Sequence, residues 1–516
     1  MSGPPPTAWH RALGLLAVVV LMAVDGINGT LLVVNRGQVM GSFDAIPDEA
    51  AWLGVAYLAA KLVAFAWTPW LVGRYGAKRA MLGGGLWLAA CTGALAFAPN
   101  LDMAVAIRAA QGACGALVLV AGQTLVFQSH ATARQPLLQA TLALAVLVVP
   151  VMAGPALHGW LTDAHDWRAT FIASSIAAAL ACAALHRARV ADARTGVAAA
   201  PGVATTLLLA AGTMGGVYVM QQGARFDWFD DGRIRLVAVA SLMSLLAALW
   251  SHRRAVRRFL RRVADHPDFV FGVCASLFAG FALFGSGAAI PLFGGVVLQL
   301  GPEHVGQLVL SSSIAAAAGL VLAAALMQAG RIPMAAPIPL GIALFMAGMW
   351  LLSLSTAQTG APQVRLATWL RGFGMGLLFM SLTMITLGGL ARELLAGGVA
   401  LFNTGRQLGG LAGGAFVSSL FEWRQPVHAT ALAQHLQPGS PALEAAQPAM
   451  AGVLVERGVA AGDAASASMA LLARQLQQQA GARAFDEIFL SLSMFFLLAI
   501  PVLVGTKVLL SRGDRR

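Results

Sequence analysis

Apolar runs long enough to cross a membrane recur along the whole chain of 516 residues. A helix needs about 20 consecutive, mostly apolar residues to span the hydrocarbon core of a bilayer. The pattern therefore predicts an all-α membrane protein with fourteen transmembrane helices. We place these spans at 13–34, 51–72, 80–98, 103–127, 136–161, 168–186, 201–222, 233–251, 268–290, 304–327, 335–355, 365–390, 398–421 and 485–510.

Two polar segments divide this pattern. The basic run SHRRAVRRFLRR at 251–262 is expected to be a cytoplasmic linker that can lie on anionic lipid as an amphipathic helix. The Ala- and Gln-rich stretch 422–484 is expected to be a long periplasmic loop before the last helix. We therefore predict an N-terminal six-helix bundle over 1–190, two additional helices with the basic linker over 191–266, and a C-terminal six-helix bundle over 267–516.

The composition excludes an ordinary soluble protein. Hydrophobic residues make up 58% of the chain and charged residues only 11%, and the mean hydropathy is +0.74, whereas soluble domains carry about 25% charged residues. The net charge of +12 suggests nucleic acid at first, but most Lys and Arg residues fall in segments on one side of the predicted membrane. That bias marks the cytoplasmic side. We therefore expect membrane lipid and no nucleic acid as a partner, and both termini in the cytoplasm.

Five charged residues fall inside the predicted spans and away from their ends: Asp25, Lys61, Arg108, Arg371 and Arg406. A charge at the bilayer centre costs about 2.5–3.5 kcal/mol on insertion scales, so such residues face the protein interior or a water-filled passage. Asp25 and Lys61 both count to the middle of their spans. They are expected to pair, directly or through water, and to take part in proton coupling. A static pair that only fixes helix packing is the alternative.

The buried arginines are the next candidates. Arg108, with Gln111 one turn later, can bind an anion or polarise a nearby acid, and it can also simply reach the interface and set topology. Arg371 and Arg406 have the same alternatives, and Arg406 shares a helix face with Asn403. We assign Arg108 to proton coupling. The candidate residues of the substrate pathway are Asn28, Gln111, Arg371, Asn403 and Arg406.

Small-residue motifs predict close helix contacts and local bending, or tight packing alone. Gly154, Pro155 and Gly159 form such a group, and Gly409 and Gly410 form another. The segments IRAAQGACGAL (107–117) and WLRGFGMGLLF (369–379) resemble each other, which suggests two related halves around a central pathway. The sequence contains no phosphate-binding loop, no metal-site spacing and no nucleophile motif. We therefore expect no enzyme activity, no cofactor and no metal.

Six short motifs point to a known family. They are PWLVGRYGAKR (69–79), RAAQGACG (108–115), GPALHGW (154–160), QQGARFDWF (221–229), FNTGRQLGG (402–410) and DEIF (486–489). The first three resemble the loop motif, the helix-4 motif and the antiporter motif of the major facilitator superfamily. The others are similar to fourteen-helix drug:proton antiporters of the EmrB type. The resemblance covers most of the chain.

The resemblance implies the major facilitator fold, with two six-helix bundles, two extra central helices and alternating access. It also implies export of amphipathic drugs across the bacterial inner membrane in exchange for protons. A periplasmic adaptor and an outer-membrane channel are implied partners. Matched by position, Asp25 is the family's helix-1 aspartate and Arg108 its helix-4 arginine. The conformational motifs correspond to Arg74, Gly76, Arg79, Gly154 and Pro155, with Gly159 in the same helix-5 motif.

Two departures from the family pattern bear on function. The loop motif usually has an acid where Gly73 stands, so the contacts that latch the bundles are expected to differ. Lys61 lies in a helix that is mostly apolar in the family, and it can neutralise Asp25 or favour acidic substrates. Two other functions stay open from the sequence alone: transport of a single metabolite or siderophore, and a membrane sensor or scaffold that transports nothing.

Overall fold

The structure is a computed structural model that describes residues 8–34, 36–150, 167–190, 192, 199–437 and 440–513. Within these residues the chain forms helices joined by short turns, with no strand, as the apolar pattern predicts. Ten of the described helices are long and apolar enough to cross a membrane. The all-α membrane fold is therefore confirmed.

The N-terminal part packs around α5, which contacts both α3 and α4, while α8 contacts α1 and α4. The fifth predicted span is described only to Pro150, so Gly154, Pro155 and Gly159 lie outside the described residues. The elements are α1 (Ala8–Val34), α2 (Arg36–Ser42), α3 (Pro47–Tyr75), α4 (Ala77–Leu95), α5 (Leu101–Ser129), η1 (Thr132–Arg134), α6 (Gln135–Ala143), η2 (Leu144–Val148) and α8 (Arg168–Arg187).

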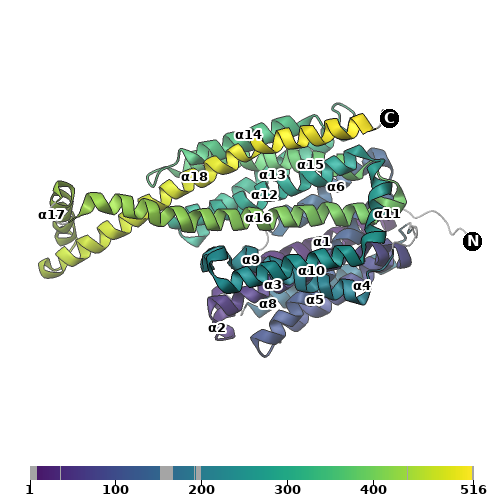
Figure 1. Ribbon diagram of the computed structural model, residues 1–516, viewed down its shortest axis with the longest axis horizontal. Coiled ribbons are helices and arrows are strands. Elements are labelled where there is room, and N and C mark those ends of the chain that lie inside the picture. The colour runs from purple at the N-terminus through teal and green to yellow at the C-terminus, as the bar shows by residue number, and fades with distance from the viewer. Residues whose placement is uncertain are drawn as a thin grey trace, which may run out of the picture.

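The C-terminal part forms the other half of the body in Figure 1. Within it, α12 packs on α16, and α15 packs between α13 and α14. The elements are α12 (Pro267–Val296), α13 (Pro302–Gln328), α14 (Pro337–Ser353), α15 (Ala361–Leu387), α16 (Arg392–Ala433), η5 (Gln434–Leu436), α17 (Pro441–Glu456) and α18 (Ala461–Gly513).

Two further helices, α9 (Val203–Gln222) and α10 (Gly232–Ser251), pack against each other between these parts. Helix α9 contacts α3 of the N-terminal part and α16 of the C-terminal part. In the turn after α9, which contains η3 (Ala224–Phe226) and η4 (Trp228–Asp230), Trp228 donates a 2.9 Å hydrogen bond to Ser419 Oγ, and Arg225 pairs with Asp48 at 2.5 Å. The extra helices therefore join both parts.

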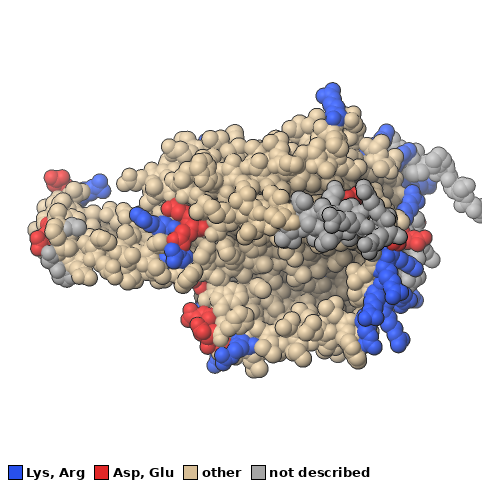
Figure 2. Space-filling model, turned by 45° about the horizontal axis from the view of Figure 1, so that its top comes forward, with Lys and Arg blue, Asp and Glu red and all other residues tan. Residues whose placement is uncertain are grey.

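The basic run predicted to be an amphipathic helix is helix α11 (Arg253–Ala264). Its arginines are exposed, whereas Val263 is buried and Phe259 packs against Gly397 at the start of α16. Figure 2 shows Lys and Arg side chains gathered at this end of the molecule. We call it the basic end, defined by α11.

The stretch 422–484 is not a loop, which corrects the sequence prediction. Helix α16 continues to Ala433, and the last helix begins at Ala461, well before its apolar run. Ala and Gln are good helix formers, and a polar helix is stable when neighbouring helices support it. Between them α17 packs on α18. The result is a helical projection, comprising the far part of α16, α17 and the first part of α18, that extends away from the basic end (Figure 1).

Side-chain contacts hold the base of this projection together. Glu487 of α18 accepts hydrogen bonds from Arg424 in a two-pronged ion pair and contacts His428 Nε2 at 3.0 Å. Gln425 donates a 2.5 Å bond to Gln477 further along the projection. Because several side-chain contacts join α16 to α18, the position of the projection is fixed relative to the rest of the fold.

Glycines let the main helices approach each other closely. A Cβ atom at Gly112 of α5 would overlap the backbone oxygen of Tyr57 in α3. In the C-terminal part, a Cβ atom at Gly409 of α16 would overlap the backbone oxygen of Leu277 in α12, and one at Gly280 would overlap that of Arg406. Gly409 therefore allows two helices to pack closely, as the small-residue motif predicts.

The two parts also meet near the basic end. Consecutive spans run in opposite directions, so α6 begins and α13 ends at this end. The amide of Leu137 in α6 donates a 3.3 Å bond to Gln328 Oε1 of α13. Beside it, Ala140 packs in an apolar cluster with Leu320 and Met384. These contacts join the N-terminal and C-terminal parts at the basic end. We call the line along which the two parts meet the seam.

Candidate functional site

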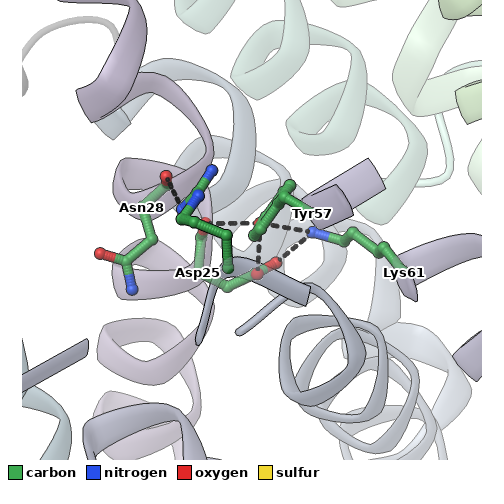
Figure 3. A network of polar contacts seen from close by, with 5 residues as sticks. Asp25, Asn28, Tyr57 and Lys61 are labelled. Atoms are coloured by element: carbon green, nitrogen blue, oxygen red, sulfur yellow. Dashed lines mark hydrogen bonds and ion pairs between the residues drawn. The ribbon is translucent and has the colours of Figure 1, made fainter. Parts of the chain in front are cut away.

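A buried ion pair joins α1 to α3 in the interior of the N-terminal part. Lys61 Nζ lies 2.8 Å from Asp25 Oδ2, and only 1% of Asp25 and 5% of Lys61 is exposed. Figure 3 shows the two side chains reaching toward each other from different helices. The pairing expected from their equal depth along the two spans is therefore present as a direct contact.

Tyr57 completes this cluster, and sequence reasoning missed it. Its hydroxyl donates to Asp25 Oδ1 at 3.0 Å and accepts a 3.2 Å bond from Lys61 Nζ. Both carboxylate oxygens are thus satisfied by groups of α3. Space for the carboxylate comes from Gly115 of α5, where a Cβ atom would overlap Asp25 Oδ1. The available signal was that Tyr57 precedes Lys61 by four residues, which puts both on one helix face.

Arg108 lies beside the cluster and forms no ion pair with the residues that the structure describes. Helix α5, which carries it, is capped by Asn100, whose side chain accepts from the Met103 amide at 2.9 Å. Arg108 Nη1 donates to the backbone oxygen of Asn28 at 3.0 Å and to Gln111 Oε1 at 2.9 Å. Its guanidinium carbon is 4.2 Å from the Tyr57 ring centre, a cation–π distance. The structure therefore brings this arginine to the Asp25–Lys61 pair through Tyr57.

Three polar side chains of neighbouring helices form a second bonded group. Asn28 Nδ2 donates to Thr92 Oγ1 at 2.9 Å, and Gln111 Nε2 donates to the same oxygen at 3.2 Å. The predicted residues Asn28 and Gln111 therefore meet, and Thr92 of α4 is the residue that joins them. A lone threonine in an apolar run gives no signal in the sequence, because its role depends on which helices face it.

Arg371 is far from this cluster in the fold and sits in the C-terminal part. It donates to Ser286 Oγ at 2.8 Å, to Ser312 Oγ at 3.1 Å and to the Leu283 oxygen at 3.0 Å. These partners belong to α12 and α13, as the partners of Arg108 belong to its own bundle's α1 and to α5. The two arginine segments that resemble each other in sequence thus occupy similar settings.

Asn403 and Arg406 of α16 lie at the seam between the two parts. Asn403 Nδ2 donates a 3.0 Å bond to Gln123 Oε1 of α5, which joins the parts directly. The guanidinium carbon of Arg406 is 5.2 Å from the Phe379 ring centre, and its Nε has no hydrogen-bond partner in the described part of the chain. Gln123 is a further residue that the sequence did not indicate.

The loop motif forms a tight turn between α3 and α4. Gly76 has a φ of 88°, a conformation that side-chain-bearing residues rarely adopt. Arg74 stacks on Trp70, and Arg79 is exposed. An acid from outside the motif, which the sequence did not indicate, lies against this turn.

This acid is Asp192, which follows α8. Its Oδ1 accepts a 3.3 Å bond from the Lys78 amide at the start of α4, and its carboxylate packs against Gly76. Lys78 Nζ also donates to the Ala188 oxygen at 2.6 Å. A negative charge is favourable at a helix start. These hydrogen bonds therefore join the end of α8 to the loop motif.

A separate groove of about 730 Å³ lies between α3, α4, α5 and α9. It is lined mostly by apolar residues, including Trp67 and Trp87, with Arg79 among the residues at its edge. A cavity of this size and character suits an apolar molecule. In the described residues, no group of three or more His, Cys, Asp or Glu side chains could hold a metal ion.

Comparisons with known proteins agree with this architecture. The chain is 24% identical to the fatty acid resistance protein FarB of Neisseria gonorrhoeae, over 97% of both chains, and 23% identical to the multidrug export protein EmrB of Escherichia coli, over 92% of this chain and 91% of that one. The solved structure of the human organic anion transporter MFSD10 is similar with a TM-score of 0.60 at 14% identity, covering 97% of this chain and 100% of that one.

A second solved structure, the proton:xylose symporter XylE, is similar with a TM-score of 0.57 at 12% identity, covering 95% of this chain and 96% of that one. These structures share the fold. Residues 14–414 match the family model described as Major Facilitator Superfamily. With its apolar helices, its fold and this match over most of its length, the chain is a multi-pass membrane protein and belongs to the major facilitator superfamily of transporters.

Proposed function

We propose that this transporter exports amphipathic compounds across the bacterial inner membrane in exchange for protons. The cluster around Asp25 carries the proposal, because Asp25 is the one acidic side chain among the buried residues that the structure describes. Ionisable groups inside membrane proteins commonly mark proton and substrate pathways. Similarity to EmrB, named as a multidrug export protein, supports export.

The geometry suits a carboxylate that gains and loses a proton. In this conformation Lys61 and Tyr57 satisfy both oxygens of Asp25. A motion that separates Asp25 from these donors leaves a charge with fewer partners, and a proton then neutralises it. Helix α16, which carries Arg406, contacts α3, which carries Lys61 and Tyr57. Movement of one part against the other therefore changes the field at the carboxyl, which couples protonation to alternating access.

The proposed alternating units are the bundles at 1–190 and 267–516, with 191–266 supplying the extra helices and the basic linker. We place the basic end, and with it both termini, in the cytoplasm. The arginines of α11 and the acidic residues at the opposite end (Figure 2) support this orientation. The loop-motif residues Arg74, Gly76 and Arg79 then lie on the cytoplasmic side.

In this orientation the helical projection extends into the periplasm. We propose that it contacts a periplasmic adaptor, which would connect the transporter to an outer-membrane channel. The repeated links between α16 and α18, such as Arg424 to Glu487, support a projection stiff enough for docking. Removal of 438–460 should abolish co-purification of an adaptor and leave transport in vesicles intact.

The Asp25→Asn variant tests the proposal. The purified protein is placed in vesicles with an imposed proton gradient, and the counterflow of protons and an amphipathic dye is recorded. We expect proton-driven transport to collapse in Asp25→Asn and to persist in Asp102→Asn, an exposed acid at the start of α5. Full proton-driven transport by Asp25→Asn would contradict the proposal. A panel of dyes, single metabolites and siderophores in the same vesicles separates broad from narrow specificity, and any flux excludes a pure scaffold.

A further inference from the structure

The buried interior of the protein is positively charged. Among the described residues, the charged side chains that are buried are Lys61, Arg108 and Arg406 against the single acid Asp25, which leaves a net charge of +2. Uncompensated charge inside a membrane protein is expensive and is usually associated with a ligand or a pathway. The question is which of these cations is available to a ligand.

Two of the three have partners within the protein. Lys61 is paired with Asp25 and bonded to Tyr57. Arg108 donates to a backbone oxygen and to Gln111 Oε1. Both therefore have acceptors inside the N-terminal part, and neither needs an external anion in this conformation.

Arg406 differs from them. It is only 5% exposed, its Nε has no hydrogen-bond partner in the described chain, and no acid lies within ion-pair distance of it there. Burying a guanidinium whose Nε has no acceptor costs free energy unless another group supplies one. The nearby Phe379 ring offsets only part of this cost through its π face.

The surroundings of Arg406 resemble a ligand site more than a packing site. Asn403, one turn earlier, bonds to Gln123 across the seam, yet its Oδ1 has no partner among the described residues. Helix α16 contacts α3 and α5 of the N-terminal part here. The free polar atoms of α16 are therefore buried where the two parts meet, which is where relative movement of the parts would open a passage.

We propose that Arg406 binds the carboxylate of an anionic amphiphile and so makes the transporter prefer acids with an apolar tail over cations. A guanidinium presents parallel N–H donors that match the two oxygens of a carboxylate. A cationic head group would meet the net positive charge of the interior and be repelled. This inference rests on the proposed function, since it names the substrate class of that transport pathway.

The test uses two probes with the same tail and opposite charge, dodecanoate and dodecyltrimethylammonium. The full-length protein is placed in nanodiscs of a zwitterionic lipid, and binding of each probe is measured by calorimetry against protein-free nanodiscs. Loss of hydrogen bonds to a charged group weakens binding by about 10- to 100-fold. We expect Arg406→Gln to weaken dodecanoate binding by this factor and Arg406→Lys to weaken it less, while dodecyltrimethylammonium binding does not fall.

The matched control is Arg365→Gln, an exposed arginine on α15 that should change neither probe. Thermal unfolding of each variant checks that it is folded, and Arg406→Lys serves as the folded comparison if Arg406→Gln does not fold. The inference is overturned if the parent protein binds both probes equally, or if Arg406→Gln weakens both to the same extent.

Because binding needs no proton gradient, the two proposals fail separately. Charge-selective binding at Arg406 without proton-driven flux would reject proton-coupled export and keep the anion site. Proton-driven flux without charge selectivity would reject the anion site and keep the export.

Discussion

The ion pair between Asp25 and Lys61 links α1 to α3. Removing its charges one at a time and together measures how far the stability contributed by each charge depends on the other. The substitutions are Asp25→Asn, Lys61→Gln and the two combined. Each single change leaves one buried charge without its partner. The double change leaves two neutral amides of similar size, which can bond to each other and to Tyr57.

The expected magnitude follows from the 2.8 Å contact. At an effective dielectric constant of about 20, two unit charges at that distance attract by about 6 kcal/mol. Desolvation of both ions offsets much of this gain, while stranding one ion costs about 3–5 kcal/mol. Each single variant should therefore lose about 3–5 kcal/mol of unfolding free energy. The double variant should be at least about 2 kcal/mol more stable than either single one, because its two costs are not additive.

The assay is equilibrium unfolding at pH 7 in mixed micelles with increasing fraction of dodecyl sulfate, followed by helical circular dichroism. All four proteins are compared at one lipid and detergent composition. Asp102→Asn, which removes an exposed acid, should change the unfolding free energy by less than about 0.5 kcal/mol.

Strict additivity would refute this reasoning. If the loss in the double variant equals the sum of the two single losses, the charges do not depend on each other for stability. A loss below about 1 kcal/mol in both single variants would equally show that the site is well hydrated, with the charges screened by water.

Three further contacts lead to specific predictions of the change in unfolding free energy in the same assay. Gly115→Ala places a Cβ atom against Asp25 Oδ1 and should cost about 1–3 kcal/mol, whereas Gly83→Ala, which has nothing within 4 Å, should be neutral or stabilising; equal effects would contradict this. Asn403→Leu leaves the Gln123 oxygen without its donor and should cost about 1–3 kcal/mol, largely recovered when Gln123→Leu is added. Asp192→Ala removes the acceptor of the Lys78 amide and should cost about 1 kcal/mol, and no change would mean that this contact adds nothing.

The apolar runs were enough to predict the all-α membrane fold, because a bilayer admits few other ways to satisfy the backbone. They do not predict the structure of 422–484, where low hydropathy indicates a loop and the chain is helical. That stretch is helical because its Ala- and Gln-rich sequence favours helix and because α16 and α18 support each other through contacts such as Arg424 to Glu487. Hydropathy reports contact with lipid, whereas helix formation also occurs in water.

Charged residues of the site were predictable and neutral ones were not. A charge within a span is costly, so Asp25, Lys61, Arg108, Arg371 and Arg406 were conspicuous in the sequence. Tyr57, Thr92 and Gln123 carry no charge, and each matters only through a partner on another helix. Asp192 was missed for a related reason, since it belongs to no motif and reaches the turn at Gly76 only after α8 has packed on α4.

The sequence by itself determined that the chain is an all-α membrane protein, because the cost of leaving apolar or charged groups in the wrong medium is local to each segment. It also determined that Asp25 and Lys61 lie at similar depth. Tertiary structure alone decided that Tyr57 joins this pair and that Arg371 bonds to two serines. It also decided that Arg406 Nε has no hydrogen-bond partner among the described residues at the seam. Those outcomes depend on how helices far apart in sequence pack side by side, which no property of a single segment contains.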